Sequence, residues 1–190
     1  MKLIRWGHFM RTLFFSLFWI FSKCFGGAFS VLAMWVNPIK YYSRKGAKIG
    51  ENCRWYSKAV CTEPFLLEIG DHVHIGSGVQ LITHDGALWV LREKLGRPGL
   101  DRFGKIVVGN NVFIGNNSIL MPGVTIGNDC IIGAGSVVTK DVSSGMIAAG
   151  IPAKKIGTVD AFADRYLPDC FETKDMAEAM RRKMILEALP

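Results

Sequence analysis

Hydrophobic residues recur at a strict interval of six in the carboxy-terminal half of the chain. Residues 108–143 divide without a gap into six blocks, VGNNVF, IGNNSI, LMPGVT, IGNDCI, IGAGSV and VTKDVS. The fifth position of every block is small or β-branched, and each block opens with an aliphatic residue: Val108, Ile114, Leu120, Ile126, Ile132 and Val138. An amphipathic helix would repeat at three and four residues and a half-buried strand at two, so neither fits. The spacing predicts a solenoid.

The block of six predicts a short strand followed by a tight corner. Three blocks then close one triangular coil of eighteen residues, in which each aliphatic residue points inward and stacks on its equivalent one coil away. Glycine and asparagine suit the corners, because both tolerate backbone dihedral angles that other residues avoid. We therefore expect an all-β fold, a parallel β-helix.

The same phase appears earlier in the chain, with two interruptions. A two-residue bulge is expected at Pro64 and Phe65, between two triplets that each keep the spacing of six. Leu81 and Val108 are 27 residues apart, which is not a multiple of six, so a loop over residues 85–105 leaves the coil and returns. His84 lies at the root of this loop, and loops on rigid scaffolds often carry function. The two triplets are Ile49, Trp55 and Cys61, and Ile69, Ile75 and Leu81.

Residues 1–45 form a separate aromatic segment. The uncharged run TLFFSLFWIFS is too short to cross a bilayer, whose apolar core needs about 20 helical residues. As a helix it would carry a thin polar stripe, aromatic residues over the rest and basic residues on both sides. Two interpretations stay open: residues 9–36 associate with a membrane interface, or the helix packs on its own domain or on a neighbouring subunit. A secretory signal peptide is a third alternative, with a loose cleavage motif at Ala28-Phe29-Ser30.

Composition and charge limit the class of protein. With 190 residues, 49% of them hydrophobic, the chain fits one domain with short appendages. The net charge of +7 favours an acidic partner, whether nucleic acid, an anionic lipid surface or a phosphorylated small molecule. Five cysteines without a CxxC pair indicate neither a disulfide framework nor a zinc ribbon, and they favour a reducing cytoplasm.

The repeat ends after Gly157, and residues 158–190 are expected to form a helical extension. The run KDMAEAMRRKMILEAL has an apolar side and could be capped by Thr173 or Asp175. We expect this helix to cover the open end of the coil, as terminal units of solenoids must.

The segment GVTIGNDCIIGAGSVVTKDVSSGMIAAGIPAKKIG, together with THDG around His84, resembles the hexapeptide-repeat acyltransferases. This family includes galactoside, maltose, serine and xenobiotic acetyltransferases; the likeness covers roughly residues 49–157, and we expect the β-helix domain to span residues 46–157. Within it, THDG followed by WV and a charged loop is most similar to O-acetyltransferases of bacterial surface-polysaccharide synthesis. The resemblance implies a left-handed coil, acetyl-CoA as co-substrate, and a homotrimer with active sites between subunits.

By the same resemblance, His84 matches the catalytic histidine, and the backbone N–H of Asn116 matches the donor to the oxyanion. A sugar hydroxyl is a poor nucleophile, and an imidazole is the side chain best suited to remove its proton near neutral pH. Asp85 is a candidate for orienting the ring, although an adjacent residue in a strand usually points to the opposite face. A solvated loop histidine is the alternative for His84.

Further positions match the binding site for acetyl-CoA. Small residues would let the pantetheine arm run against the backbone, and lysines suit its phosphates. Two positions depart from the family, since relatives often carry tryptophan at the position of Phe113 and arginine at that of Gly157. The matching residues are Phe113, Ala134, Ser136, Thr139, Lys140 and Lys154, with Lys155 either a further contact or simply solvated.

The sequence thus predicts an acetyl-CoA-dependent O-acetyltransferase acting on a sugar hydroxyl of a surface polysaccharide or its lipid-linked precursor. Asp85, Trp89 and Arg92, with Glu93, are the candidates for binding the acceptor. We expect no metal and no nucleic acid partner, and a cytoplasmic protein that could lie on the inner face of the membrane. A xenobiotic acetyltransferase and a non-catalytic scaffold are the alternatives.

Overall fold

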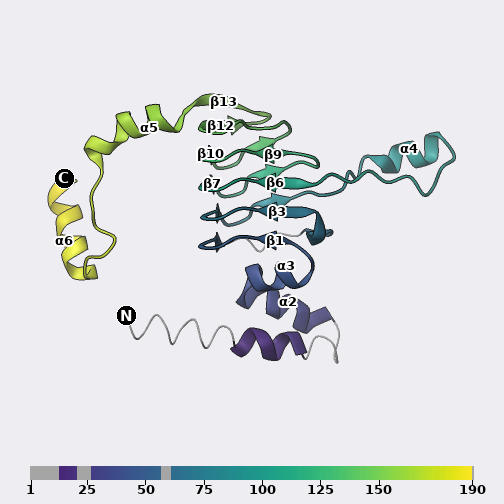
Figure 1. Ribbon diagram of the computed structural model, residues 1–190, viewed down its shortest axis with the longest axis horizontal. Coiled ribbons are helices and arrows are strands. Elements are labelled where there is room, and N and C mark those ends of the chain that lie inside the picture. Colours follow the sequence, from purple (N-terminus) through teal and green to yellow (C-terminus); the bar gives the residue numbers. More distant parts are fainter. Residues whose placement is uncertain (1–12, 21–26, 57–60, 190) are drawn as a thin grey trace. The chain divides into compact units, whose positions relative to one another are not determined.

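The computed structural model describes residues 13–20, 27–56 and 61–189 (Figure 1). The chain forms two compact units, Met1–Val159 and Asp160–Pro190, and each is described here by itself.

Three sheets of very short strands build the first unit. The first contains β1 (Lys48–Ile49), β3 (Leu67–Ile69), β6 (Ile106–Val108) and β9 (Thr125–Ile126). The second contains β2 (Arg54–Trp55), β4 (His74–Ile75), β7 (Val112–Ile114), β10 (Cys130–Ile132), β12 (Met146–Gly150) and β13 (Ala153–Thr158). The third contains β5 (Gln80–Leu81), β8 (Ile119–Leu120) and β11 (Val137–Val138).

The chain visits the three sheets in rotation, so β6, β7 and β8 complete one turn and β9, β10 and β11 the next. Parallel pairing joins Val108 to Ile126 and Ile114 to Ile132, partners that are eighteen residues apart in the sequence. Only β13 breaks the rule, because it pairs antiparallel with β12. The predicted coil of three blocks is confirmed, and we call this part of the chain the coil.

The first position of each block forms the core of the coil. Ile114, Leu120, Ile126 and Ile132 are fully buried, and all the other aliphatic positions from residue 55 onward in this phase are nearly so. The fifth positions also point inward: Ser118 and Ser136 are fully buried, and both hydroxyls donate to the carbonyl oxygen of Gly133. Burial falls off at the ends of the coil, where Ile49 and Val142 are only half-buried.

Glycine and asparagine have different roles at the corners of the coil, although the sequence analysis gave both the same one. Asn111, Asn117 and Asp129 adopt the left-handed conformation, with φ values of 55°, 59° and 53°. The glycines before them serve close packing instead: a Cβ on Gly115 would lie 2.5 Å from the nitrogen of Ala134 in the next coil. Asparagine therefore supplies the turn, and glycine lets neighbouring coils approach.

Residues 82–105, which we call the arm, leave the coil as a hairpin. The backbone of Asp85 donates to Arg102 at 2.9 Å and that of Gly104 donates to Thr83 at 2.9 Å, and His84 is bridged to Phe103. The distal part forms helix α4 (Leu88–Lys94), which projects from the coil in Figure 1. The sequence predicted the excursion at the correct place but as a loop without a helix.

The amino-terminal part of the unit is helical, so the term all-β describes only the coil. Residues 13–20 are helical, followed by α2 (Gly27–Val36) and α3 (Pro38–Arg44). Asn37 caps α3 by accepting from the backbone of Lys40 at 3.0 Å. The buried Tyr42 of α3 stacks on Trp55 with ring centroids 4.8 Å apart, so α3 closes the first end of the coil. No helix within the described ranges has the length and apolar character needed to cross a bilayer.

Two details of the sequence analysis change in the structure. The expected bulge at Pro64 is a short 3-10 helix, Pro64–Leu66, which absorbs the extra residues before β3.

Helix α6 begins later than expected and spans Glu178–Ala188, with Ala177 at its amino-terminal cap and no side-chain hydrogen bond there. Thr173 and Asp175 are therefore wrong as caps, since both precede the helix by too many residues. Helix α5 (Val159–Tyr166) and a 3-10 turn, Leu167–Asp169, come before it.

An ion cluster on the outer face of the first sheet gives a prediction about acid stability. The Glu68 carboxylate accepts from Lys105 and Lys48, each at 2.8 Å, and these two contacts lower the pKa of Glu68 to about 2. A depressed pKa stabilises the fold above the ordinary value of 4.5, and that contribution is lost as pH falls from 4.5 towards 2. We expect Glu68→Gln to lower the melting temperature slightly at pH 7 and not at all near pH 2, since the cluster is exposed. Thermal melts of both proteins across this range would test it, and an equal difference at every pH would contradict it.

Candidate active site

His84 stands where the arm leaves the coil, at the corner between the third and the first sheet. Its side chain is 43% exposed, so one edge of the ring faces solvent. Its Nδ1 atom lies 2.9 Å from the hydroxyl of Thr62 and 3.2 Å from the carboxylate of Glu63. Phe103, across the hairpin, approaches the ring edge-on at 6.5 Å. These contacts hold one nitrogen of the imidazole, and within residues 13–20, 27–56 and 61–189 no hydrogen bond engages Nε2, which can therefore meet a substrate.

Glu63 organises this corner. Its Oε2 atom accepts from the hydroxyl of Thr83 at 2.5 Å and from that of Thr62 at 2.8 Å. Partial burial raises the pKa of Glu63, but the hydrogen bonds from Thr83, Thr62 and His84 outweigh burial and bring the pKa below its ordinary value. The carboxylate is thus ionised at neutral pH and can accept a hydrogen bond from the protonated Nδ1 of His84. In that tautomer the lone pair of the imidazole is on Nε2, which faces outward. Such an arrangement suits a general base.

Asp85 does not share this task. Its carboxylate receives the guanidinium of Arg102 at 3.1 Å and the backbone N–H of Ala87 at 3.0 Å, which ties together the two strands of the arm. Among the described residues, no hydrogen bond or ion pair joins Asp85 to the ring of His84. The structure therefore gives the orienting contact to Glu63, which is one coil earlier, and not to the neighbour in sequence.

Asn116 lies at a different corner of the same chain. It precedes β8 at the entry to the third sheet, whereas His84 follows β5 at the exit from that sheet. Its side chain accepts from Ser77 at 2.9 Å and its carbonyl oxygen from Gly135 at 2.8 Å. Among the described residues, none accepts from the backbone N–H of Asn116. Within one chain, the ring of His84 and the backbone N–H of Asn116 therefore lie at opposite edges of the third sheet.

The carrier candidates fall on two corners. Phe113 points outward from β7 and is 43% exposed, and Ala134 lies against Gly115 at the corner between the second and third sheets. Lys140 follows β11 at the corner between the third and first sheets, directly after Thr139. Ser136 is fully buried, and its hydroxyl is occupied by Gly133 and Gly150, so its side chain cannot contact a carrier.

Lys140 and Lys155 meet in a cavity of about 230 Å³ near the last turn of the coil. Lys154, the neighbour of Lys155 on β13, does not line it. Of the lysines considered, the pair able to bind phosphate together is therefore Lys140 with Lys155. The other lining residues are Asp141, Val142, Ser143, Met146, Ala148 and Ala153.

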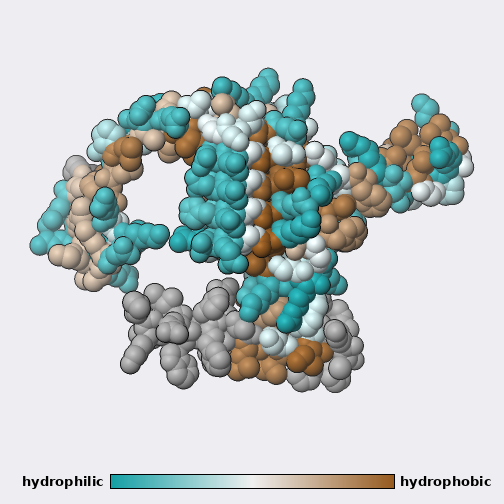
Figure 2. Space-filling view, in the orientation of Figure 1, coloured by the Kyte–Doolittle hydropathy of each residue, from teal (hydrophilic) through white to brown (hydrophobic). Residues whose placement is uncertain are grey.

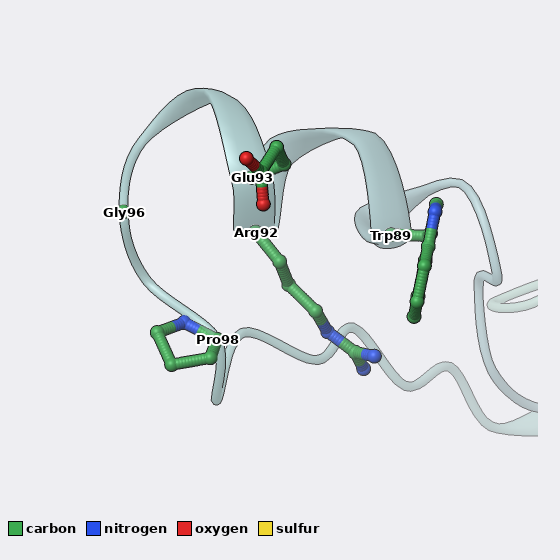
Figure 3. A pocket seen from close by; sticks show the side chains of 5 residues that line it. All are labelled: Trp89, Arg92, Glu93, Gly96 and Pro98. Atoms are coloured by element: carbon green, nitrogen blue, oxygen red, sulfur yellow. The ribbon is translucent and has the colours of Figure 1, made fainter.

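Three of the acceptor candidates gather at the tip of the arm, whereas Asp85 lies at its base and does not line the same cavity. Trp89, Arg92 and Glu93 line a cavity of about 600 Å³ with Gly96 and Pro98 (Figure 3). Trp89 is 74% exposed, whereas Arg92 is engaged: its Nε donates to the carbonyl oxygen of Leu100 at 2.7 Å and its guanidinium pairs with Asp101. Arg92 thus closes the tip of the arm, and Trp89 is the side chain available to a ligand.

Two features of the site escaped the sequence analysis. The first is the contact of Glu63 with His84: Glu63 immediately precedes the 3-10 turn Pro64–Leu66, and His84 lies one coil later. The second is a row of aromatic rings along the outer face of the second sheet. The ring centroid of His74 lies 5.2 Å from that of Tyr56 and 5.0 Å from that of Phe113. His74 and Phe113 are direct partners in neighbouring strands, although they are 39 residues apart in the sequence. Because the arm is inserted between them, a period of six does not predict this pairing.

Comparison with known proteins agrees with this architecture. Residues 105–140 match the family described as "Bacterial transferase hexapeptide (six repeats)". Protein CapG of Staphylococcus aureus is 49% identical over 134 residues, which cover 69% of this chain and 77% of CapG. The galactoside O-acetyltransferase of Escherichia coli is 35% identical over 66% of this chain and 61% of its own length.

Two solved structures share the fold. A hexapeptide-repeat acetyltransferase of Vibrio cholerae complexed with acetyl coenzyme A superposes with a TM-score of 0.53 at 29% identity, over 60% of this chain and 61% of that one. A galactoside acetyltransferase in complex with coenzyme A gives a TM-score of 0.54 at 28% identity, over 72% and 74%. The three-sided coil, the matched repeats and the long alignment with CapG together establish that the chain belongs to the hexapeptide-repeat acyltransferase family.

Proposed function

We propose that the protein is an acetyl-CoA-dependent O-acetyltransferase acting on a sugar hydroxyl of a surface polysaccharide or its lipid-linked precursor. The transfer is assigned to residues 46–157, a left-handed β-helix, with residues 1–45 and 158–190 as appendages. The observation that carries the proposal is the imidazole of His84, anchored through Nδ1 by Glu63 and exposed at the root of the arm. The similarity to sugar acetyltransferases supports the substrate class.

His84 begins the reaction as a general base. Its Nε2 removes the proton of the sugar hydroxyl while that oxygen attacks the thioester carbon, and Glu63 stabilises the positive charge that develops on the ring. The backbone N–H of Asn116, which has no acceptor among the described residues, is suited to receive the negative charge on the carbonyl oxygen. The carbon–sulfur bond then breaks, and the imidazolium gives its proton to the departing thiolate, which releases coenzyme A as the thiol and regenerates the free base.

Acetyl-CoA supplies the activated acetyl group, and the residues present fit it. Ala134 is small, and a Cβ on its neighbour Gly135 would meet nothing within 4 Å, so this corner leaves room for an extended pantetheine chain. Lys140 and Lys155 place two positive charges in one cavity, which suits the phosphates of the nucleotide. Phe113 offers an exposed aromatic surface to the thioester end.

A homotrimer would complete the site. Because His84 and Asn116 lie at different corners of one chain, a complete set of groups requires the His84 corner of one subunit to face the Asn116 corner of the next. Three copies around an axis parallel to the coil would close such an arrangement. The arm, which carries Trp89 beyond the coil, would then reach the same interface from outside.

Acetyl transfer can be tested directly with radiolabelled acetyl-CoA. The purified chain is incubated with a panel of bacterial surface glycans, their lipid-linked precursors and an antibiotic acceptor, and calorimetry measures binding of acetyl-CoA alone. We expect binding of acetyl-CoA and label on a glycan. Transfer to the antibiotic alone would favour the xenobiotic enzyme, and no binding would favour a scaffold; either result would contradict the proposal.

The contact between Glu63 and His84 predicts the behaviour of Glu63→Gln. The amide keeps the size of the side chain but removes the negative charge that stabilises the protonated ring. We expect kcat to fall by roughly 10- to 100-fold, as for other outer partners of catalytic histidines, with KM for acetyl-CoA unchanged. Steady-state kinetics across pH measures both constants, and Glu51→Gln, a change at an exposed glutamate near the first end of the coil and outside the proposed site, serves as the control. A change confined to KM would show that Glu63 does not act through the ring.

A further inference from the structure

In the described part of the helices before the coil, buried side chains alternate with large exposed apolar ones. Phe15 of the helical residues 13–20 is fully buried and lies beneath the guanidinium of Arg44, whose carbon is 4.9 Å from the ring centroid. Leu13, Leu17 and Ile20 recur at intervals of four and three on another side of this helix, and each is at least 43% exposed. This helix therefore packs on its own domain and still presents aliphatic side chains to its surroundings.

Helix α2 adds to the same kind of surface. Its sequence, GAFSVLAMWV, contains no charged residue, yet Leu32 and Trp35 are exposed, Trp35 by 56%. A helix that is apolar on all sides normally lies in a protein core or in lipid. Figure 2 shows brown, hydrophobic residues at the surface of this part of the molecule, with white and teal residues beside them. We call the exposed residues of the two helices the apolar face: Leu13, Phe14, Leu17, Ile20, Leu32 and Trp35.

The positive charge of the protein is concentrated in the same part of the chain. Eight of the 23 Lys and Arg residues, and none of the 16 Asp and Glu residues, lie within the first fifty positions. The other 140 positions hold 15 basic and 16 acidic residues, so they are close to neutral. Arg44 and Lys45, at the end of α3, are exposed among the described members of this group. An apolar surface bordered by positive charge alone is complementary to anionic lipid.

We propose that the apolar face docks on an anionic lipid surface. The aliphatic and aromatic side chains enter the boundary between headgroups and acyl chains, and the basic residues bind the phosphates. The helices lie in the plane of the interface, consistent with the absence of a spanning helix among the described residues. Tyr42, stacked on Trp55, connects this layer to the coil. Docking thereby tethers the coil to the surface on which a lipid-linked acceptor resides.

A second copy of the chain is the competing occupant of the apolar face. Two copies meeting through this face would bring their unbalanced positive charges together, which is unfavourable without intervening anions. Anionic lipid instead neutralises those charges. The charge distribution therefore favours lipid over self-association.

Co-sedimentation with vesicles tests the docking with the full chain. We expect binding to phosphatidylcholine mixed with phosphatidylglycerol, weak binding to phosphatidylcholine alone, and weakening by salt. Leu17→Glu and Ile20→Glu should each reduce binding on the order of tenfold, because a charge enters the buried surface. Lys45→Gln should reduce it roughly fivefold. Leu186→Glu, which changes an equally exposed leucine on α6, should bind like the parent protein.

Three results would overturn the docking. These are equal binding to neutral and anionic vesicles, unchanged binding by the glutamate variants, and conversion of a larger assembly to a smaller one by those variants in sedimentation velocity without lipid. Circular dichroism checks that they fold, and Trp35→Gln, at an exposed position, provides a milder variant. The inference does not rest on acetyl transfer: docking variants should still acetylate a water-soluble acceptor, whereas vesicle binding without transfer would contradict only the proposed enzyme.

Discussion

Replacing His84 by alanine is expected to reduce the rate of acetyl transfer by about 10²- to 10⁴-fold, the contribution typical of a positioned general base. The loss should appear in kcat, because the ring acts on the hydroxyl proton in the transition state and not on the acetyl-CoA already bound. The surrounding corner should survive, since the His84 side chain is 43% exposed and Glu63 keeps its two threonine donors. Turnover with a matched acceptor, together with calorimetric titration of acetyl-CoA, measures both expectations.

His72 provides the matched control for His84. It is an exposed histidine at another corner of the coil, where its Nδ1 lies 2.8 Å from the side-chain oxygen of Asn111. Because His72 has a φ of 55°, asparagine is the replacement that keeps its backbone conformation. We expect His72→Asn to retain normal transfer. If His84→Ala also stays within tenfold of the parent rate, His84 is not the base.

The coil could be predicted because its signal is repeated. A single buried aliphatic residue carries little information, but a position that recurs every six residues identifies both the strand and its inward face. Ser118 and Ser136 show where this signal stops: their small size at the fifth position was noted, but Ser136 was assigned to the carrier, whereas both side chains are fully buried and the carbonyl oxygen of Gly133 accepts from both hydroxyls. Neighbouring coils repeat the same local interactions, so the rule learned from one block applies to the next.

The site was predictable only in part, because its residues meet through interactions outside the repeat. His84 was found from its place at the root of the arm. Glu63 was not found, because the 3-10 turn at Pro64 interrupts the spacing of six residues from which its position beside His84 could have been predicted. The arm itself resisted prediction for the same reason: Arg92 and Asp85 make contacts local to a hairpin that has no counterpart elsewhere in the chain.

A core substitution tests whether the period of six carries the stability of the coil. Ile126 is fully buried, pairs with Val108 in the preceding coil and is bridged to Val142 in the following one. Ile126→Ala removes methyl and methylene groups between two rigid neighbours that cannot close the gap, so we expect a loss of about 2–5 kcal/mol in the free energy of unfolding. Thr125→Ala, at the exposed neighbouring position on β9, should change it by less than about 0.5 kcal/mol. Denaturant unfolding followed by circular dichroism measures both values.

The size of the contrast between these two variants is the informative quantity. In a solenoid each coil is held mainly by its neighbours, so a cavity at Ile126 weakens the coupling between the coils on either side of it. If Ile126→Ala does not fold, Ile126→Val should still fold and lose about 0.5–1.5 kcal/mol. Equal effects at residues 125 and 126 would mean that the two faces of β9 are equally buried, which is incompatible with a coil in which only one face of the strand points into the core.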